Sequence, residues 1–205
     1  MANLSHIFTL YKRRVESLKQ CCSRIESQAA HKSLHVADRD LLYESILLTA
    51  TAVFEHLLED LLVEMVCGPP STHPGHFPLL RPKSRAAFRH IYLQGQGYVS
   101  MLPYNNTIRM ADLYLNGGLP FTLVANPERD LLSQAIKIRH AVAHRSKKAY
   151  QEFRAKVPGV QGLPQNRRFP GPFLRTIFRA NPTQSRLDLY LNNLVQILHA
   201  LTTSW

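Results

Sequence analysis

One arginine and two histidines stand within a six-residue segment of this chain, RHAVAH at residues 139–144. Histidine titrates near neutral pH, so His144 can take a proton from a ribose 2′-hydroxyl and return one to a leaving oxygen. Arginine keeps its charge, so Arg139 can hold a phosphate through two hydrogen bonds while negative charge builds. Such chemistry needs no metal and requires RNA, because DNA lacks the 2′-hydroxyl. Cleavage of RNA is therefore one chemistry that this segment permits.

Two other interpretations of the same residues remain open. His140 and His144 have the four-residue spacing by which a zinc-peptidase helix holds its metal. That motif also needs a glutamate directly after the first histidine, where this chain has Ala141, and no further ligand follows at a suitable spacing. We therefore expect neither a metal ion nor another cofactor. The second interpretation is structural, with both histidines hydrogen-bonded at a contact between helices and doing no chemistry.

The arginine and the histidines are expected on a long helix that spans residues 126–153. Asn126 can cap its start, Pro127 suits the first turn, and Glu128 and Asp130 favour the positive end of the helix dipole. A core-facing stripe at helical spacing consists of Leu131, Ala135, Ile138, Val142, Ala149 and Phe153. The two histidines lie roughly opposite this stripe, and Arg139 lies on its shoulder.

A regular helix does not aim Arg139 and His144 at the same atom. Five residues turn a helix through about 500°, so the two side chains diverge by about 140°. Either the arginine wraps around the helix, or a second copy of the chain faces the first. A twofold homodimer would form one cleft from two such helices, and we expect this assembly.

Helices are also expected along the rest of the chain. The spacing of apolar residues places them at about residues 4–30, 38–66, 83–93, 109–115 and 183–202, with Gly95 and Gly97 ending the third. No stretch is a convincing strand. At 205 residues the chain fits one domain, residues 1–205, and we predict an all-α bundle of four to six helices with long loops.

One acidic residue in the second predicted helix departs from its apolar pattern. Glu55 lies seven positions from both Leu48 and Leu62, and therefore shares a column of the helix with two apolar residues. Its carboxylate lies either at the edge of the solvent or in a groove where it meets a cation.

The chain is strongly basic, with a formal net charge of +11 and a pI near 9.9. This charge predicts attraction to polyanions, of which nucleic acid is the commonest. A segment at about residues 156–182 combines prolines and arginines with phenylalanines, which suits single-stranded RNA because aromatic rings stack on bases. Alternatively, these rings fix the loop to the bundle and the arginines face water. The residues expected to bind substrate are Arg145, Lys147, Lys148, Arg167 and Arg168.

Composition also bears on the cellular compartment. Cys21, Cys22 and Cys67 form an odd number of cysteines without a CxxC pair, so we expect reduced thiols in the cytoplasm. No stretch approaches the roughly 20 apolar residues of a membrane span, and the first residues do not have the order of a secretory signal. We expect no association with a membrane.

The segment at residues 139–144 resembles the signature of the HEPN superfamily (higher eukaryotes and prokaryotes nucleotide-binding). In that signature an arginine precedes a histidine by four to six residues and is commonly followed by Asn, Asp or His, which His140 satisfies. The upstream sequence FEHLLEDLL around Glu55 and the final amphipathic helix are similar as well. HEPN domains are helical bundles, often dimeric, and many are metal-independent endoribonucleases of toxin–antitoxin, phage-defence or RNA-processing systems.

The resemblance implies a role for each residue of the site. Arg139 and His144 match the catalytic arginine and histidine, His140 matches the polar residue that orients them, and Glu55 is similar to an acid of the upstream helix. The expected products are a 2′,3′-cyclic phosphate and a 5′-hydroxyl. HEPN toxins paired with nucleotidyltransferases have a tyrosine where this chain has Ser146, although an antitoxin or inhibitor protein is still a possible partner. The alternative is a non-catalytic HEPN module that binds RNA, nucleotide or a protein.

Overall fold

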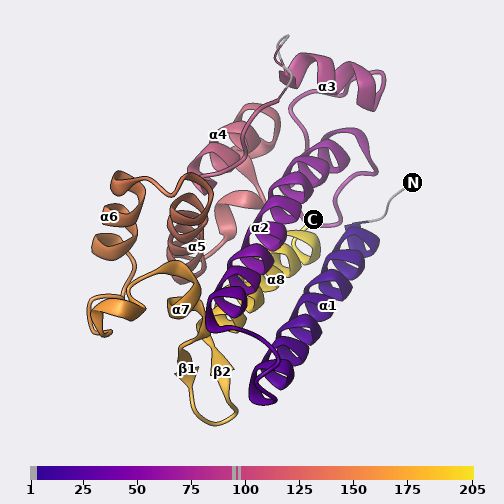
Figure 1. Ribbon diagram of the computed structural model, residues 1–205. Coiled ribbons are helices and arrows are strands. Elements are labelled where there is room, and N and C mark those ends of the chain that lie inside the picture. The colour runs from indigo at the N-terminus through magenta and orange to yellow at the C-terminus, as the bar shows by residue number, and fades with distance from the viewer. Residues whose placement is uncertain (1–3, 94–95, 97) are drawn as a thin grey trace.

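The computed structural model describes residues 4–93, 96 and 98–205, which form a bundle of helices around the long helix α2 (Figure 1). The α-helices are α1 (Leu4–Ala30), α2 (Val36–Cys67), α3 (Arg85–Leu93), α4 (Tyr104–Tyr114), α5 (Asn126–His144), α6 (Lys147–Lys156), α7 (Pro170–Arg175) and α8 (Arg186–Thr203). The predicted all-α fold is confirmed, although the short helices α3, α6 and α7 take the described part of the chain beyond four to six helices. None of the described helices is long and apolar enough to cross a membrane.

Helix α2 forms the centre of the core because it is apolar on almost every side. Its 32 residues contain neither glycine nor proline, and the helix ends where Gly68, Pro69 and Pro70 follow. Helices α1, α5, α7 and α8 pack against it. Its side chains that are closed to solvent include Leu47, Ala50, Phe54, Leu58, Leu61 and Leu62. The other elements of the bundle therefore take their positions from this helix.

The single long helix expected at residues 126–153 is wrong, because the chain forms two helices there. Arg145 adopts a left-handed conformation with φ 46° and ends α5 at His144. Ser146 then starts α6 by accepting a hydrogen bond from the backbone N–H of Ala149, at 3.2 Å. At the other end, Ala125 occupies the capping position and Asn126 is already helical. The two histidines consequently lie in the last turns of α5.

The segment at residues 156–182, expected to be a loop, contains short ordered elements. They are the 3₁₀ helix η3 (Gln165–Arg167), helix α7, and strand β1 (Ile177–Arg179), which pairs antiparallel with β2 (Gln184–Ser185). This hairpin corrects the expectation that the chain has no strand. Phe173 is completely buried, whereas Phe169 and Phe178 remain 41% and 52% exposed. Only one of the three rings therefore fixes this segment in the core.

The segment between α2 and α5 is also more helical than expected. The helix predicted at residues 109–115 begins earlier, as α4 at Tyr104, and two 3₁₀ helices follow it, η1 (Asn116–Gly118) and η2 (Phe121–Leu123). The predicted end of α3 at Gly95 and Gly97 lies outside the described residues.

Helix α7 approaches α2 so closely that only glycine fits at their contact. A Cβ atom on Gly171 would lie 2.6 Å from the Cβ atom of Asp40 and 2.8 Å from its carbonyl oxygen. We predict that Gly171→Ala lowers the free energy of unfolding by about 1–3 kcal/mol, because backbone atoms must separate. Denaturant titration followed by circular dichroism measures this change.

The control is Gly162→Ala in the same segment. There the nearest atom to an added Cβ is 3.7 Å away, so the substitution should leave stability almost unchanged. Equal losses in the two variants would show that the contact between α7 and α2 is not the cause.

Candidate active site

An ion pair joins Glu55 of α2 to Arg139 of α5. The distance from Nη1 of Arg139 to Oε2 of Glu55 is 3.2 Å. The carboxylate side chain is only 6% exposed, and the arginine side chain is 28% exposed. Of the two positions left open for Glu55, the structure has the one in which the carboxylate is held in a groove and meets a cation. Arg139 is thereby directed toward α2.

The second oxygen of Glu55 is held by the segment that precedes α4. Oε1 accepts hydrogen bonds from the hydroxyl of Ser100 at 2.7 Å and from the backbone N–H of Leu102 at 3.3 Å. Tyr98 also donates a hydrogen bond to this carboxylate. Sequence reasoning missed both side chains, because a tyrosine and a serine in a loop carry no periodic signal.

These contacts keep Glu55 charged at neutral pH. Burial by itself raises the pKa of Glu55. The hydrogen bonds from Tyr98 and Ser100 and the charge of Arg139 together lower it by more, so the pKa lies below its ordinary value. Burial and the bond to Glu55 raise the pKa of Tyr98 to about 12, so its hydroxyl stays a donor. The site therefore presents a charged arginine beside a fixed counter-charge.

The two histidines form a pair at the exposed end of α5. Their ring centroids are 5.7 Å apart and the rings meet edge to face at 72°. Burial lowers the pKa of His140, and the positive charges of His144 and Arg139 lower it further. A neutral imidazole accepts a proton, so His140 keeps this capacity to a lower pH than an isolated histidine. His140 lies close enough to both Arg139 and His144 for their charges to act on its pKa.

Within one chain, Arg139 and His144 remain apart, because no break in α5 lies between them to bring their side chains together. Helix α5 continues through His144, so the divergence of about 140° between the two side chains applies to it. Arg139 is held by α2, whereas His144 is exposed at the end of α5. One copy of the chain therefore offers two separate halves of a site.

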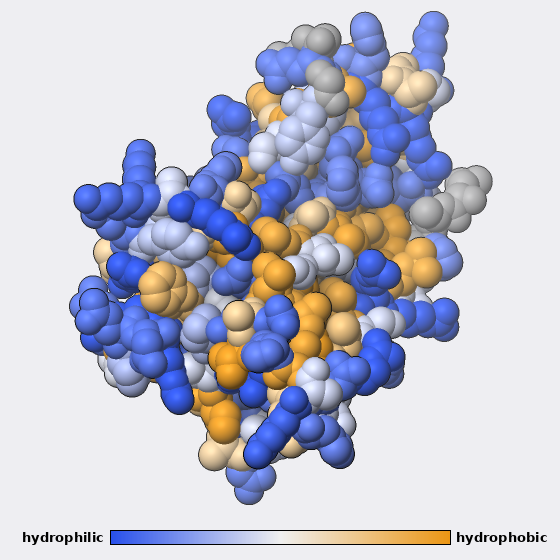
Figure 2. All heavy atoms as spheres, viewed as in Figure 1, coloured by the Kyte–Doolittle hydropathy of each residue, from blue (hydrophilic) through white to orange (hydrophobic). Residues whose placement is uncertain are grey.

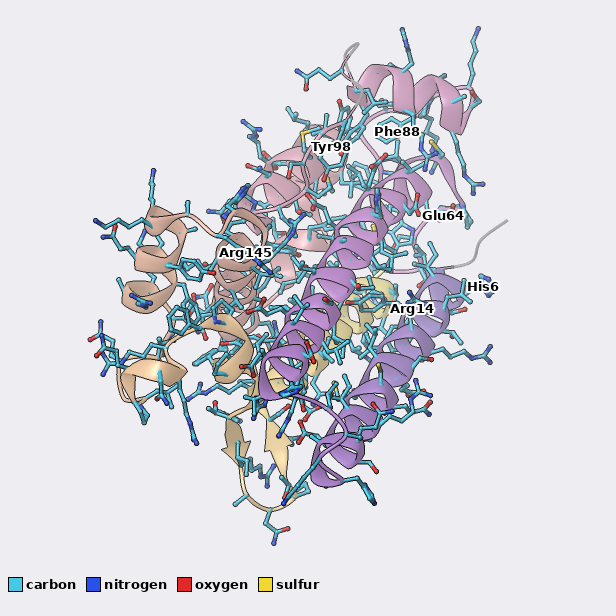
Figure 3. All side chains as sticks on the ribbon, viewed as in Figure 1. His6, Arg14, Glu64, Phe88, Tyr98 and Arg145 are labelled. Atoms are coloured by element: carbon cyan, nitrogen blue, oxygen red, sulfur yellow. The ribbon has the colours of Figure 1, made fainter. Side chains whose placement is uncertain are left out.

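The residues expected to bind substrate divide into two groups. Arg145, Lys147 and Lys148 are exposed next to the histidine pair, and Nη2 of Arg145 lies 3.9 Å from Oε2 of Glu44 on α2. In Figure 3, Arg145 and Tyr98 both lie beside α2. The second group belongs to η3 and the residue after it. Arg167 is exposed, but the Nε of Arg168 donates to the carbonyl of Leu163 at 2.7 Å and so holds the loop.

No three histidine, cysteine, aspartate or glutamate side chains gather as metal ligands within the described part of the chain. Comparison of the chain with protein-family models, with curated proteins and with solved structures finds no match. The function is therefore argued from the geometry of the site.

We predict that Glu55→Gln destabilises the fold, because it leaves the Arg139 guanidinium without its counter-charge. The expected loss in unfolding free energy at neutral pH is about 1–3 kcal/mol. The folded-state pKa of Glu55 is lowered, so its stabilisation is complete above the ordinary glutamate pKa and is lost as the pH falls through the lowered value. Wild type and variant should therefore converge in acid, which denaturant titrations at several pH values measure.

The control for this comparison is Glu16→Gln, which changes the same charge at an exposed position of α1. Glu16→Gln should leave the free energy of unfolding unchanged at every pH. A difference between wild type and Glu55→Gln that persists unchanged in acid would contradict an electrostatic origin.

Proposed function

We propose that this protein is a metal-independent endoribonuclease of the HEPN type, acting in toxin–antitoxin, phage-defence or stress RNA cleavage. The observation that carries the proposal is the Arg139–Glu55 ion pair next to two exposed, mutually contacting histidines. A fixed guanidinium can stabilise a phosphorane and an imidazole can move a proton, so the set contains both functions that cleavage needs. The net charge of +11 supports attraction to an RNA backbone.

In the proposed reaction His144 removes the proton of a ribose 2′-hydroxyl. The 2′-oxygen bonds to phosphorus, the bond from phosphorus to the 5′-oxygen breaks, and the departing oxygen receives a proton from a histidine. Arg139 stabilises the charge on the pentacoordinate phosphate, Glu55 fixes the direction of the guanidinium, and His140 orients the pair. The products are a 2′,3′-cyclic phosphate and a 5′-hydroxyl.

A second copy of the chain would complete this site by placing its own histidine opposite Arg139. The outward side of α2 supports such a homodimer, because it has no charged side chain between Glu44 and Glu59 apart from the buried Glu55. Partly exposed apolar residues there include Leu48, Val53 and Leu57, and Leu42, which is 37% exposed, lies just before Glu44. Figure 2 shows hydrophobic residues gathered over α2, with hydrophilic residues on both sides. A twofold contact would bury this face beside the arginine.

We predict that the purified protein cleaves RNA in the presence of EDTA. Arg139→Ala and His144→Ala should each lower the rate by at least about 10²-fold while RNA binding is retained. Arg139→Lys should also be impaired, because an ammonium lacks the planar pair of donors. The rates are measured on labelled RNA, and the ends of the products are identified chemically.

Arg14→Ala, at an exposed position of α1 away from α5, is the matched control and should cleave normally. If the wild type cleaves no RNA and both site variants bind RNA as tightly as the wild type, the alternative function applies. The protein is then a non-catalytic module that binds RNA, nucleotide or a protein partner. The limited exposure of Arg139, at 28%, is the observation that favours this alternative.

The dimer is tested with Ala52→Arg at an exposed position of α2. Two such arginines would face each other across a twofold contact, so self-association should weaken at least tenfold and cleavage should fall with it. Ala86→Arg, exposed on α3, is the matched control. Sedimentation equilibrium measures the association. A monomeric wild type that still cleaves would contradict the composite site.

A further inference from the structure

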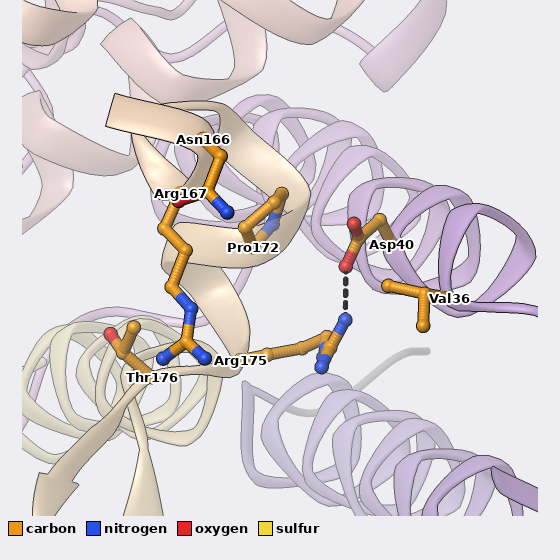
Figure 4. Close-up of a pocket in the computed structure, with 7 residues that line it drawn as sticks. All are labelled: Val36, Asp40, Asn166, Arg167, Pro172, Arg175 and Thr176. Atoms are coloured by element: carbon orange, nitrogen blue, oxygen red, sulfur yellow. Dashed lines mark hydrogen bonds and ion pairs between the residues drawn. The ribbon is translucent and has the colours of Figure 1, made fainter. Parts of the chain in front are cut away.

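A pocket in two connected parts lies between the first turns of α2 and the segment from η3 to α7. We call it the α2–α7 pocket. Its parts, of about 500 and 370 Å³, share the residues Asp40, Asn166 and Pro172. None of these three residues belongs to the proposed catalytic set, whereas Arg145 and Arg167, which were expected to bind substrate, also line the pocket. Figure 4 shows the smaller part, with Arg167 on one side, Asp40 on the other, and Arg175 reaching between them to its ion pair with Asp40.

The larger part combines an aromatic ring with carboxylates. Phe169 lines it and is 41% exposed, and its ring and that of Tyr150 meet edge to face, with 5.9 Å between the ring centroids. The guanidinium of Arg154 lies over the ring, 5.1 Å from its centroid. Asp38 and Glu44 line the same part of the pocket. A planar group that carries hydrogen-bond donors fits such surroundings, because it can stack on the ring and donate to a carboxylate.

Glu44 has an oxygen to offer to a ligand. Its Oε1 accepts from the backbone N–H of Gly171 at 3.0 Å. Its Oε2 is 3.9 Å from Arg145, which is too far for a direct hydrogen bond, and no other described residue donates to it. Burial raises the pKa of Glu44 more than its contacts lower it, so the carboxylate is incompletely stabilised. Donors from a ligand would supply what is missing.

The smaller part of the pocket offers arginines. Arg175 forms an ion pair with Asp40, and its Nε is buried without a hydrogen-bond partner. Arg167 lines the same space, and no described residue accepts a hydrogen bond from its guanidinium. Thr176 adds a hydroxyl. This end suits a phosphate group, because arginine binds phosphate with paired, charge-assisted hydrogen bonds.

We infer that the α2–α7 pocket binds a guanine nucleotide, with the base stacked on Phe169 and donating to Glu44, and with the phosphate on Arg167 and Arg175. Guanine alone among the RNA bases presents neighbouring N1–H and N2–H donors, and these match Oε2 of Glu44 and the second lone pair of Oε1, which Gly171 leaves unused. Adenine and cytosine place an acceptor beside their amino group, and uracil flanks its single donor with two acceptors. Arg145, Arg167 and Arg175 around the pocket would repel a basic side chain of a partner protein.

The location suggests how the pocket would serve the proposed ribonuclease, on which this part of the inference rests. Glu44 precedes Glu55 by 11 positions on α2, which corresponds to about 16 Å along the helix. A guanosine bound there would hold an RNA a few nucleotides from Arg139 and close to His144, whose neighbour Arg145 lines the pocket. The enzyme would then prefer to cleave at a set distance from a guanosine. Binding is measurable without cleavage, so the two proposals can fail separately.

The test uses the intact chain carrying His144→Ala, so that RNA is not consumed. Calorimetry compares 5′-GMP with 5′-AMP, 5′-CMP and 5′-UMP, and compares short single-stranded RNAs with and without one guanosine. We expect the guanine ligands to bind at least tenfold more tightly than their matched counterparts. If GMP binds as tightly as the guanosine-containing RNA, the ligand of the pocket is a free nucleotide. If the RNA binds more tightly, the ligand is a guanosine within the RNA substrate.

Variants assign the two ends of the pocket. Glu44→Gln should abolish the preference for guanine, and Arg167→Ala should lower the affinity for all four nucleotides at least tenfold. The controls Glu16→Gln and Arg24→Ala, at exposed positions of α1, should change neither the preference nor the affinity. If Glu44→Gln unfolds, Phe169→Ala is the second test, because the ring is 41% exposed and loss of stacking should weaken the binding of the guanine ligands. Equal binding of all four nucleotides, or no binding at all, would overturn the inference. Binding of an arginine-rich peptide that depends on Glu44 would replace the nucleotide with a protein ligand.

Discussion

The ion pair between Glu55 and Arg139 connects the two helices on which the candidate site depends. A carboxylate that is only 6% exposed is costly to bury unless its charge is compensated, and here Arg139, Ser100, Leu102 and Tyr98 all contribute. The pair therefore fixes the arginine, and it also fixes the segment before α4 against α2. Because α2 is packed on several sides, the direction of the guanidinium is set by the core rather than by the surface.

Helix α2 meets two demands at once, and these explain its composition. Its inner side must fill the core, so it carries mostly leucine and phenylalanine, and its buried carboxylates Glu55 and Glu64 are paired with arginines. Its outer side is nevertheless uncharged over three turns, and this is unusual for a surface in a chain with a net charge of +11. The dimer that we propose would resolve this conflict. It would also bring together the arginine and the histidine that the geometry of one helix keeps apart.

The segment from α6 to α8 depends on the same helix. Gly171 lets α7 approach Asp40 at a distance that any other side chain would prevent, and its backbone N–H donates to Glu44. Phe173 is buried in the core, and Phe169 remains at the pocket. The arginines of this segment are thus held at defined positions around the first turns of α2, where Asp40 and Glu44 compensate part of their charge.

The sequence by itself determined most of the helices and the residues that are able to do chemistry. Helical periodicity is a local property, so α1 was predicted with its actual bounds, and α2 and α8 within a few residues. The break at Arg145 was missed because the apolar stripe continues across it to Phe153, although Ser146 is an ordinary capping residue. Only the tertiary structure decided that Glu55 meets Arg139, because these residues are 84 positions apart. It also decided that Tyr98 and Ser100 join them and that Phe169 lines a pocket, because contacts between distant segments arise from packing and leave no pattern in neighbouring residues.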